Sequence, residues 1–190
     1  MPTTAPIPAR RASPLPPDER RAAILAAVIP LLVEHGSGVT SRQIAEAAQV
    51  SEGTVFKVFA DKDELIAAAV EQATDPAPFE HAIAEIETDV PFVERLTAAT
   101  ELIRQRVVDI WRLVSRVGAD HHPPDHRPLP DSPALVALIA SGADQLRLAP
   151  AEAARLLRAL TLSSTHPLLA AEPASASDIV DVFLHGVEVR

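Results

Sequence analysis

The side chains best suited to binding chemistry lie close together in the chain, between residues 40 and 65. This segment holds both lysines of the protein, Lys57 and Lys62, together with Arg42. Such cations bind phosphate groups, and an arginine can also donate two hydrogen bonds to a guanine edge. Hydroxylated and small side chains stand among them and can bond phosphate or allow a close approach to a base. The full set of candidate contact residues is Thr40, Ser41, Arg42, Ser51, Gly53, Thr54, Phe56, Lys57 and Lys62.

Two short predicted helices, joined by a tight turn, position this set. The first begins at Thr40 or Ser41, since either side chain can cap a helix, and the second begins at Ser51. In the second helix, Val55 and Phe59 lie four residues apart and face the core. The opposite face then carries Gly53, Thr54, Phe56 and Lys57. This arrangement is typical of the helix-turn-helix, which presents its second helix to the major groove of DNA.

Further helices on both sides complete this N-terminal unit. An earlier helix starts near Pro17, where proline suits the first turn, and ends at Gly36. A later helix starts after Asp61, with Glu64 three residues further on to complete a capping box, and continues toward Pro76. The apolar stripe of the earlier helix consists of Ile24, Leu25, Val28, Leu32 and Val33.

Residues 20–72 resemble the DNA-binding signature of the TetR family of bacterial transcriptional regulators. The resemblance is carried by Thr-x-x-x-Ile-Ala from Thr40, Val-Ser-x-Gly-Thr-Val-Phe-x-x-Phe from Val50, and x-Lys-x-x-Leu from Asp61. It implies an all-α homodimer whose first three helices read a palindromic operator in double-stranded DNA. The later helices would enclose a pocket for a small-molecule effector, and the last two, near 150–165 and 176–188, would form the dimer interface. Repression, with release by the effector, is the function that this resemblance implies.

Three residues depart from the family pattern. Gln49 stands in the turn where the family usually has glycine, and a residue with a side chain tolerates that backbone less well. Phe56 replaces a tyrosine whose hydroxyl would bond phosphate, and Val58 replaces a histidine or tyrosine. A second hypothesis follows from these departures: the protein binds a small molecule with the same fold but has weak or lost specific DNA binding.

The whole chain is expected to be all-α, with a helix-turn-helix domain followed by a helical ligand-binding and dimerisation domain. We expect a flexible arm over residues 1–16, the DNA-binding domain over 17–74 and the second domain over 75–190. Ser177 and Asp178 are candidates to cap the final helix. The predicted downstream helices cover 78–88, 91–117, 133–147, 150–165 and 176–188, with a Pro/His/Asp-rich loop at 118–131.

The second domain offers apolar residues for a ligand pocket. Trp111 lies on the long predicted helix, where it either stacks on a ligand or packs in the core. The chain has no tyrosine, which favours a ligand held mainly by shape and apolar contact. The candidate lining residues are Phe79, Phe92, Leu102, Ile103, Val107, Trp111, Leu135 and Leu138.

Composition argues against other classes of protein. There is no cysteine, and no Ser-His-acid spacing stands out, so we expect no enzyme and no cofactor. A metal cluster in the loop at 118–131, formed by His121, His122 and His126 with Asp120 and Asp125, is the less favoured reading of a solvated loop. No signal peptide or membrane span is expected, which favours a cytoplasmic protein.

The net charge of −9 is unusual for a protein that binds nucleic acid. Local charge matters more than the total, and the acidic excess lies mostly downstream of residue 75. Arg10 and Arg11 in the arm can add cationic contacts to a DNA groove, although a disordered tail without a partner is the simpler reading.

Overall fold

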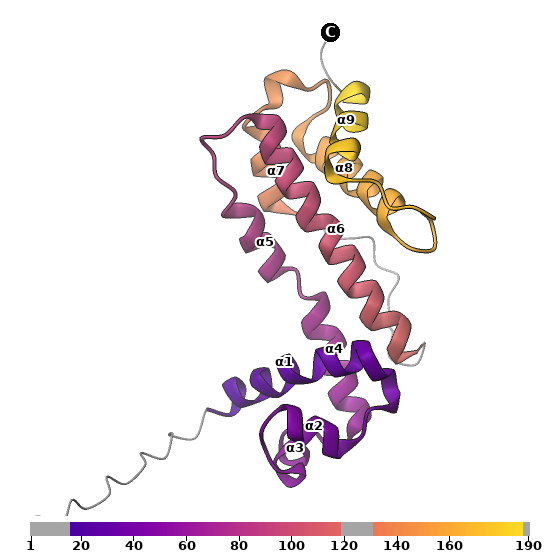
Figure 1. Cartoon of the computed structure of the whole chain (residues 1–190). Helices are drawn as coiled ribbons and strands as arrows, with labels where there is room; N and C mark the ends of the chain where they lie inside the picture. Colours follow the sequence, from indigo (N-terminus) through magenta and orange to yellow (C-terminus); the bar gives the residue numbers. More distant parts are fainter. Residues whose placement is uncertain (1–15, 119–130, 188–190) are drawn as a thin grey trace, which may run out of the picture.

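The structure, a computed structural model, describes residues 16–118 and 131–187, and these residues form helices without any strand (Figure 1). The all-α fold with an N-terminal helix-turn-helix and a helical second part is therefore confirmed. In the order of the chain, the α-helices are α1 (Pro17–His35), α2 (Ser41–Ala47), α3 (Glu52–Val58), α4 (Lys62–Thr74), α5 (Ala77–Ala84), α6 (Phe92–Val117), α7 (Pro133–Ala140), α8 (Pro150–Thr165) and α9 (Ala176–Val187).

Helix α1 follows the predicted pattern of a helix that covers a core. Pro17 occupies its first turn beside Asp18 and Glu19, whose charges suit the helix N-terminus. Its apolar stripe is buried against the neighbouring helices. Together with the turn that follows it, Pro17–Gly38 is long and apolar enough to cross a membrane by length and composition alone. Here the apolar stripe packs inside the protein instead.

Side-chain caps define where the next three helices begin. Thr40 accepts from the Gln43 amide, while the Gln43 side chain accepts from the Thr40 amide, and this reciprocal pair starts α2. The side chains of Ser51 and Asp61 cap α3 and α4 by accepting from the amides of Thr54 and Glu64. Glu64 differs slightly from the prediction, because its carboxylate accepts from the amide of Ala60 rather than from that of Asp61.

The core of the helix-turn-helix region includes the end of a helix from the second part of the chain. Leu113, Val114 and Val117 of α6 are buried in the same cluster as the apolar residues of α1–α4. Figure 1 shows α6 running from the C-terminal helices down to α1 and α4. The two parts of the chain therefore share one hydrophobic core at this end, and α6 is its only contributor from downstream among the described residues.

The end of α1 lies directly on the end of α6. Gly36 has φ of 61° and ψ of −152°, a conformation that essentially only glycine adopts. A Cβ at this position would lie 2.4 Å from the carbonyl oxygen of Arg116. Glycine is thus needed here both for its backbone angles and for the space between the two helices.

A second core holds the C-terminal helices together. It joins α5, α6, α7, α8 and α9 around fully buried side chains such as Leu96, Leu157 and Phe183. Each such side chain contributes about 1.5–3 kcal/mol relative to an exposed one. Helix α6 takes part in both cores, so it is the element that fixes their relative position.

The boundaries of some predicted helices were wrong. The helix expected over 133–147 ends at Ala140, because the chain turns at Ser141 and Gly142 before a short 3-10 helix at Ala143–Gln145. The helix expected over 78–88 ends at Ala84. Ser175, rather than Ser177 or Asp178, accepts from the amide that starts α9.

Replacing Gly36 by alanine tests the contact between α1 and α6. We expect Gly36→Ala to lower the free energy of unfolding by about 2 kcal/mol or more, because it adds both backbone strain and a clash with Arg116. Urea denaturation measures the change. Gly38→Ala is the control, since a Cβ there meets nothing within 4 Å, and its effect should stay within about 0.5 kcal/mol. Equal stability of the two variants would contradict this account.

Candidate functional site

Helix α3 presents an exposed ridge on the face away from the core. Val55 is buried, whereas Gly53 and Lys57 are exposed and the Phe56 side chain is 42% exposed. Thr54 is half-buried. Phe56 is therefore a surface residue of the ridge and not part of the core.

The fold does not require a glycine at position 53. A Cβ added to Gly53 would have the Ser51 hydroxyl oxygen at 4.0 Å as its nearest neighbour. Alanine would thus fit, and glycine inside a helix costs about 0.5–1 kcal/mol relative to alanine. Packing within the chain therefore does not explain the glycine at this exposed position.

Lys57 and Lys62 have different roles in the structure. Lys57 is exposed on the ridge, and within the described residues no hydrogen bond or ion pair is formed by its amine. The Lys62 amine instead donates to the carbonyl of Ser37 at 2.9 Å, which ties the start of α4 to the turn after α1. Of the two lysines, Lys57 is the one that is available to an external phosphate or base.

Arg42 stands on the exposed surface of α2. Its Nε donates to the Glu46 carboxylate at 2.8 Å, one turn further along the helix. This hydrogen bond, together with the charge of Glu46, raises the pKa of Arg42 above its ordinary value. Both side chains are largely exposed, so a phosphate or guanine can displace Glu46 at little cost.

The predicted hydroxyl contacts are mostly used within the chain. Thr40 and Ser51 act as helix caps, and the Ser51 and Thr54 hydroxyls lie 2.9 Å apart. Ser41 is half-buried at the first position of α2. The side-chain oxygens of Thr40 and Ser51 therefore define where α2 and α3 begin.

The turn between α2 and α3 has the strained residue that the sequence predicted. Gln49 has φ of 55°, and it is the one non-glycine residue with positive φ among those described. The amide of Val50 donates to the carbonyl of Ala45 at 3.0 Å, which closes the turn behind α2. A residue other than glycine is therefore accommodated at this position, at a conformational cost of about 1–2 kcal/mol.

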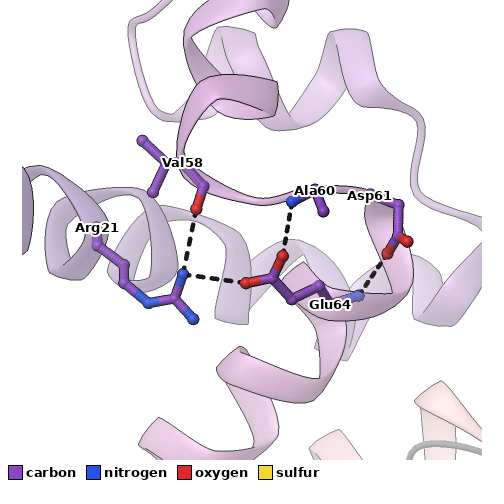
Figure 2. Close-up of polar contacts among 5 residues, drawn as sticks. All are labelled: Arg21, Val58, Ala60, Asp61 and Glu64. Atoms are coloured by element: carbon purple, nitrogen blue, oxygen red, sulfur yellow. Dashed lines mark hydrogen bonds and ion pairs between the residues drawn. The ribbon is translucent and has the colours of Figure 1, made fainter.

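Arg21 holds the far end of α3 in place (Figure 2). Its guanidinium donates to the carbonyl of Val58 at 3.3 Å and lies 3.5 Å from the carboxylate of Glu64. The same group lies 4.4 Å from the centre of the Phe59 ring. Three helices, α1, α3 and α4, thus meet at one cation, which fixes the direction in which the ridge points.

A pocket in the second part of the chain lies between α6 and α8. Its volume is about 340 Å³. Three predicted ligand residues line it, namely Ile103, Val107 and Trp111. Sequence reasoning missed its other lining residues, which are Arg106, Ile110, Val114, Arg158, Leu162 and His166. Periodicity along α6 pointed to Ile110 and Val114 as apolar positions, but no sequence signal related α8 to them.

The remaining predicted ligand residues lie elsewhere. Phe92 and Leu135 are buried in the second core. Leu138 lines a smaller pocket, of about 250 Å³, between α5 and α7. The Phe79 ring lies 5.5 Å from the guanidinium carbon of Arg106, and Leu102 packs half-buried against the core.

Metal binding finds no support in the described part of the chain, where His, Asp and Glu form no group of three suited to a metal. The candidate cluster of His121, His122 and His126 with Asp120 and Asp125 lies outside the described residues, as do Arg10 and Arg11.

An exposed helix held behind a tight turn on a three-helix core defines a helix-turn-helix protein. Residues 24–69 match the family model for bacterial regulatory proteins of the tetR family. An HTH-type transcriptional repressor of Mycobacterium tuberculosis is 41% identical over 70 residues, which cover 36% of this chain and 37% of that protein. The helix-turn-helix region of the chain is thus similar to the DNA-binding region of the TetR family.

Solved structures with the same architecture cover nearly the whole chain. A TetR transcriptional regulator from Streptomyces coelicolor has a TM-score of 0.53 and 28% identity, covering 88% of this chain and 98% of that one. A structure described as the molecular basis for control of antibiotic production by bacterial hormones has a TM-score of 0.62 and 23% identity, covering 90% and 98%. The fold thus extends over both parts of the chain, whereas the match to the mycobacterial repressor spans little more than a third of either protein.

Proposed function

We propose that the protein is a transcriptional repressor of the cytoplasm that binds a palindromic DNA operator as a homodimer. A small, mainly apolar effector would release it. The observation that carries the proposal is the ridge of Gly53, Phe56 and Lys57, which is exposed although its own fold has no need of the glycine. A helix that leaves small and cationic residues outward is suited to the major groove.

Cationic side chains and a small residue would together contact the DNA. Lys57 supplies charge for a phosphate or hydrogen bonds for a guanine edge, and Arg42 adds a second cation from α2. Gly53 lets the helix backbone approach the bases. Two copies related by symmetry would set two recognition helices about 34 Å apart, or a multiple of that distance, so that the operator should be a palindrome.

The last two helices carry apolar side chains on their outer surface, as a dimer interface requires. Leu156 on α8 is 43% exposed and Val182 on α9 is 59% exposed. Helices α8 and α9 pack against each other, and pairing with a second copy would bury these side chains in a four-helix interface. We propose that α8 and α9 form this interface.

Helix α6 offers the route by which an effector changes DNA affinity. Its middle lines the pocket, and its end lies in the core that it shares with α1–α4. In addition, Arg106 Nη2 donates to the carbonyl of Thr74 at 2.6 Å, at the last residue of α4. A ligand that prefers a shifted α6 lowers operator affinity by the same factor by which the operator lowers ligand affinity.

A second candidate function is ligand binding with weak or lost specific DNA recognition. The residues Phe56 and Val58, which carry no phosphate-binding hydroxyl, favour it, as does the internal bond of Lys62. Sequencing the genomic DNA retained by the purified protein separates the two candidates. Enrichment of one palindromic sequence supports the repressor, and it supplies the operator for the measurements below. Retention without sequence preference supports the alternative.

Gly53→Ala should change stability and DNA affinity in opposite directions. The added methyl group has room and favours the helix, so the free energy of unfolding should rise by about 0.5–1 kcal/mol. Operator affinity should fall, because the methyl group stands between the helix and the groove. Thermal unfolding and fluorescence anisotropy measure the two effects. A variant that binds the operator as well as the original chain would remove the main support for the proposal.

Lys57→Ala should weaken operator binding roughly tenfold, because it removes a cationic contact to the DNA. The slope of the logarithm of affinity against the logarithm of salt concentration should also decrease in magnitude by about one. Lys57→Arg is the matched control and should retain most of the affinity. Unchanged retention of operator DNA in a gel shift would show that α3 is not the reading helix.

Leu156→Glu and Val182→Glu should each weaken the dimer, since either variant places a charge in an apolar interface. Sedimentation equilibrium should show a monomer at concentrations where the original chain is dimeric. Val93→Glu is the control, because Val93 is 48% exposed on α6 and lies outside the proposed interface. Dissociation by Val93→Glu alone would place the interface elsewhere.

A further inference from the structure

The pocket between α6 and α8 combines an apolar wall with two cations. Its volume of about 340 Å³ is at the lower end of the range for small-molecule sites, roughly 300–1,000 Å³. Arg106 from α6 and Arg158 from α8 line the same cavity. The apolar wall consists of Ile103, Val107, Ile110, Trp111, Val114 and Leu162.

Both guanidinium groups are half-buried, and carboxylates of the chain lie near each of them. Burial lowers the pKa of Arg106 even though Asp75 attracts the charge, and the proximity of Arg158 lowers it further. Burial likewise lowers the pKa of Arg158 in spite of Glu80 and Asp131. Arginine stays protonated in proteins, so these directions indicate two half-buried cations held together at a cost. An anion between them would reduce that cost.

His166 adds a polar side chain to the same pocket. The amide of Leu168 donates to Nδ1 of His166 at 3.3 Å. The ring packs edge-on against Trp111, with 4.5 Å between the ring centres. The pocket therefore has cationic and polar groups in an otherwise apolar surface.

We propose that this pocket binds a small apolar acid whose carboxylate is held by Arg106 and Arg158. Its hydrocarbon part lies against the apolar wall and Trp111. A guanidinium group matches a carboxylate with two parallel hydrogen bonds, and such charge-assisted bonds gain strength away from bulk water. This inference rests on the proposed function for the role of the ligand as effector, and it adds the chemistry that the effector must have.

Trp111 is the single tryptophan of the chain, so its fluorescence reports on the pocket directly. Decanoate and decan-1-ol are suitable probes, because they share a chain length and differ in charge. In titrations of the full-length protein, decanoate should bind at least tenfold more tightly than decan-1-ol. Equal affinities, or no saturable change with decanoate, would overturn the proposal.

Substitutions assign the preference to the two arginines. Arg158→Gln and Arg106→Gln should each weaken decanoate binding about tenfold while leaving decan-1-ol binding nearly unchanged. Arg155→Gln is the matched control, since Arg155 lies on α8 outside the pocket and pairs with Asp131 at 3.7 Å. Loss of the preference in Arg155→Gln, or its retention in Arg158→Gln, would show that general surface charge attracts the acid.

The comparison of the two probes in the original chain needs no variant, so it remains decisive if a substitution prevents folding. It also needs no DNA. Operator binding without a preference for decanoate would overturn this inference and leave the repressor proposal intact. A preference for decanoate without operator binding would support the inference and favour the second candidate function.

Discussion

The structure depends on one packing contact, in which the C-terminal end of α6 completes the hydrophobic core of α1–α4. Leu113, Val114 and Val117 close the apolar cluster of α1–α4, and Gly36 lets α1 end directly on the carbonyl of Arg116. Interiors packed at this density transmit displacement because they have no room to absorb it. A shift of α6 would therefore either move α1 or open this core, and both would change the packing of the helices that support α3.

The polar residues of the helix-turn-helix region differ in whether they bond within the chain or point outward. Thr40, Ser51, Asp61 and Lys62 use their hydrogen bonds to set where helices begin and how the turns meet. The residues left outward by these internal bonds form the ridge. Rigid support of this kind would reduce the conformational entropy that the ridge loses if it binds DNA as proposed.

The pocket and the core of the helix-turn-helix region lie along the same helix, α6. Helix α6 presents Arg106 to the pocket and to the end of α4, while its last turn lies beneath the helix-turn-helix. An acid that draws on the guanidinium of Arg106 acts on a group that also stabilises α4. In the proposed function, Arg106 and α6 would connect ligand binding to DNA affinity without any contact between the two sites.

The sequence by itself determined the caps of α2, α3 and α4 and the apolar faces of α1, α3 and α6. Caps at Thr40, Ser51 and Asp61 and the apolar spacing of α1, α3 and α6 depend on neighbours a few residues away, which a single chain displays directly. It did not reveal that the Lys62 amine bonds to Ser37 or that Arg106 and Arg158 share a cavity. Those contacts join residues far apart in the chain, and packing in three dimensions, rather than local preference, decides which distant side chains meet.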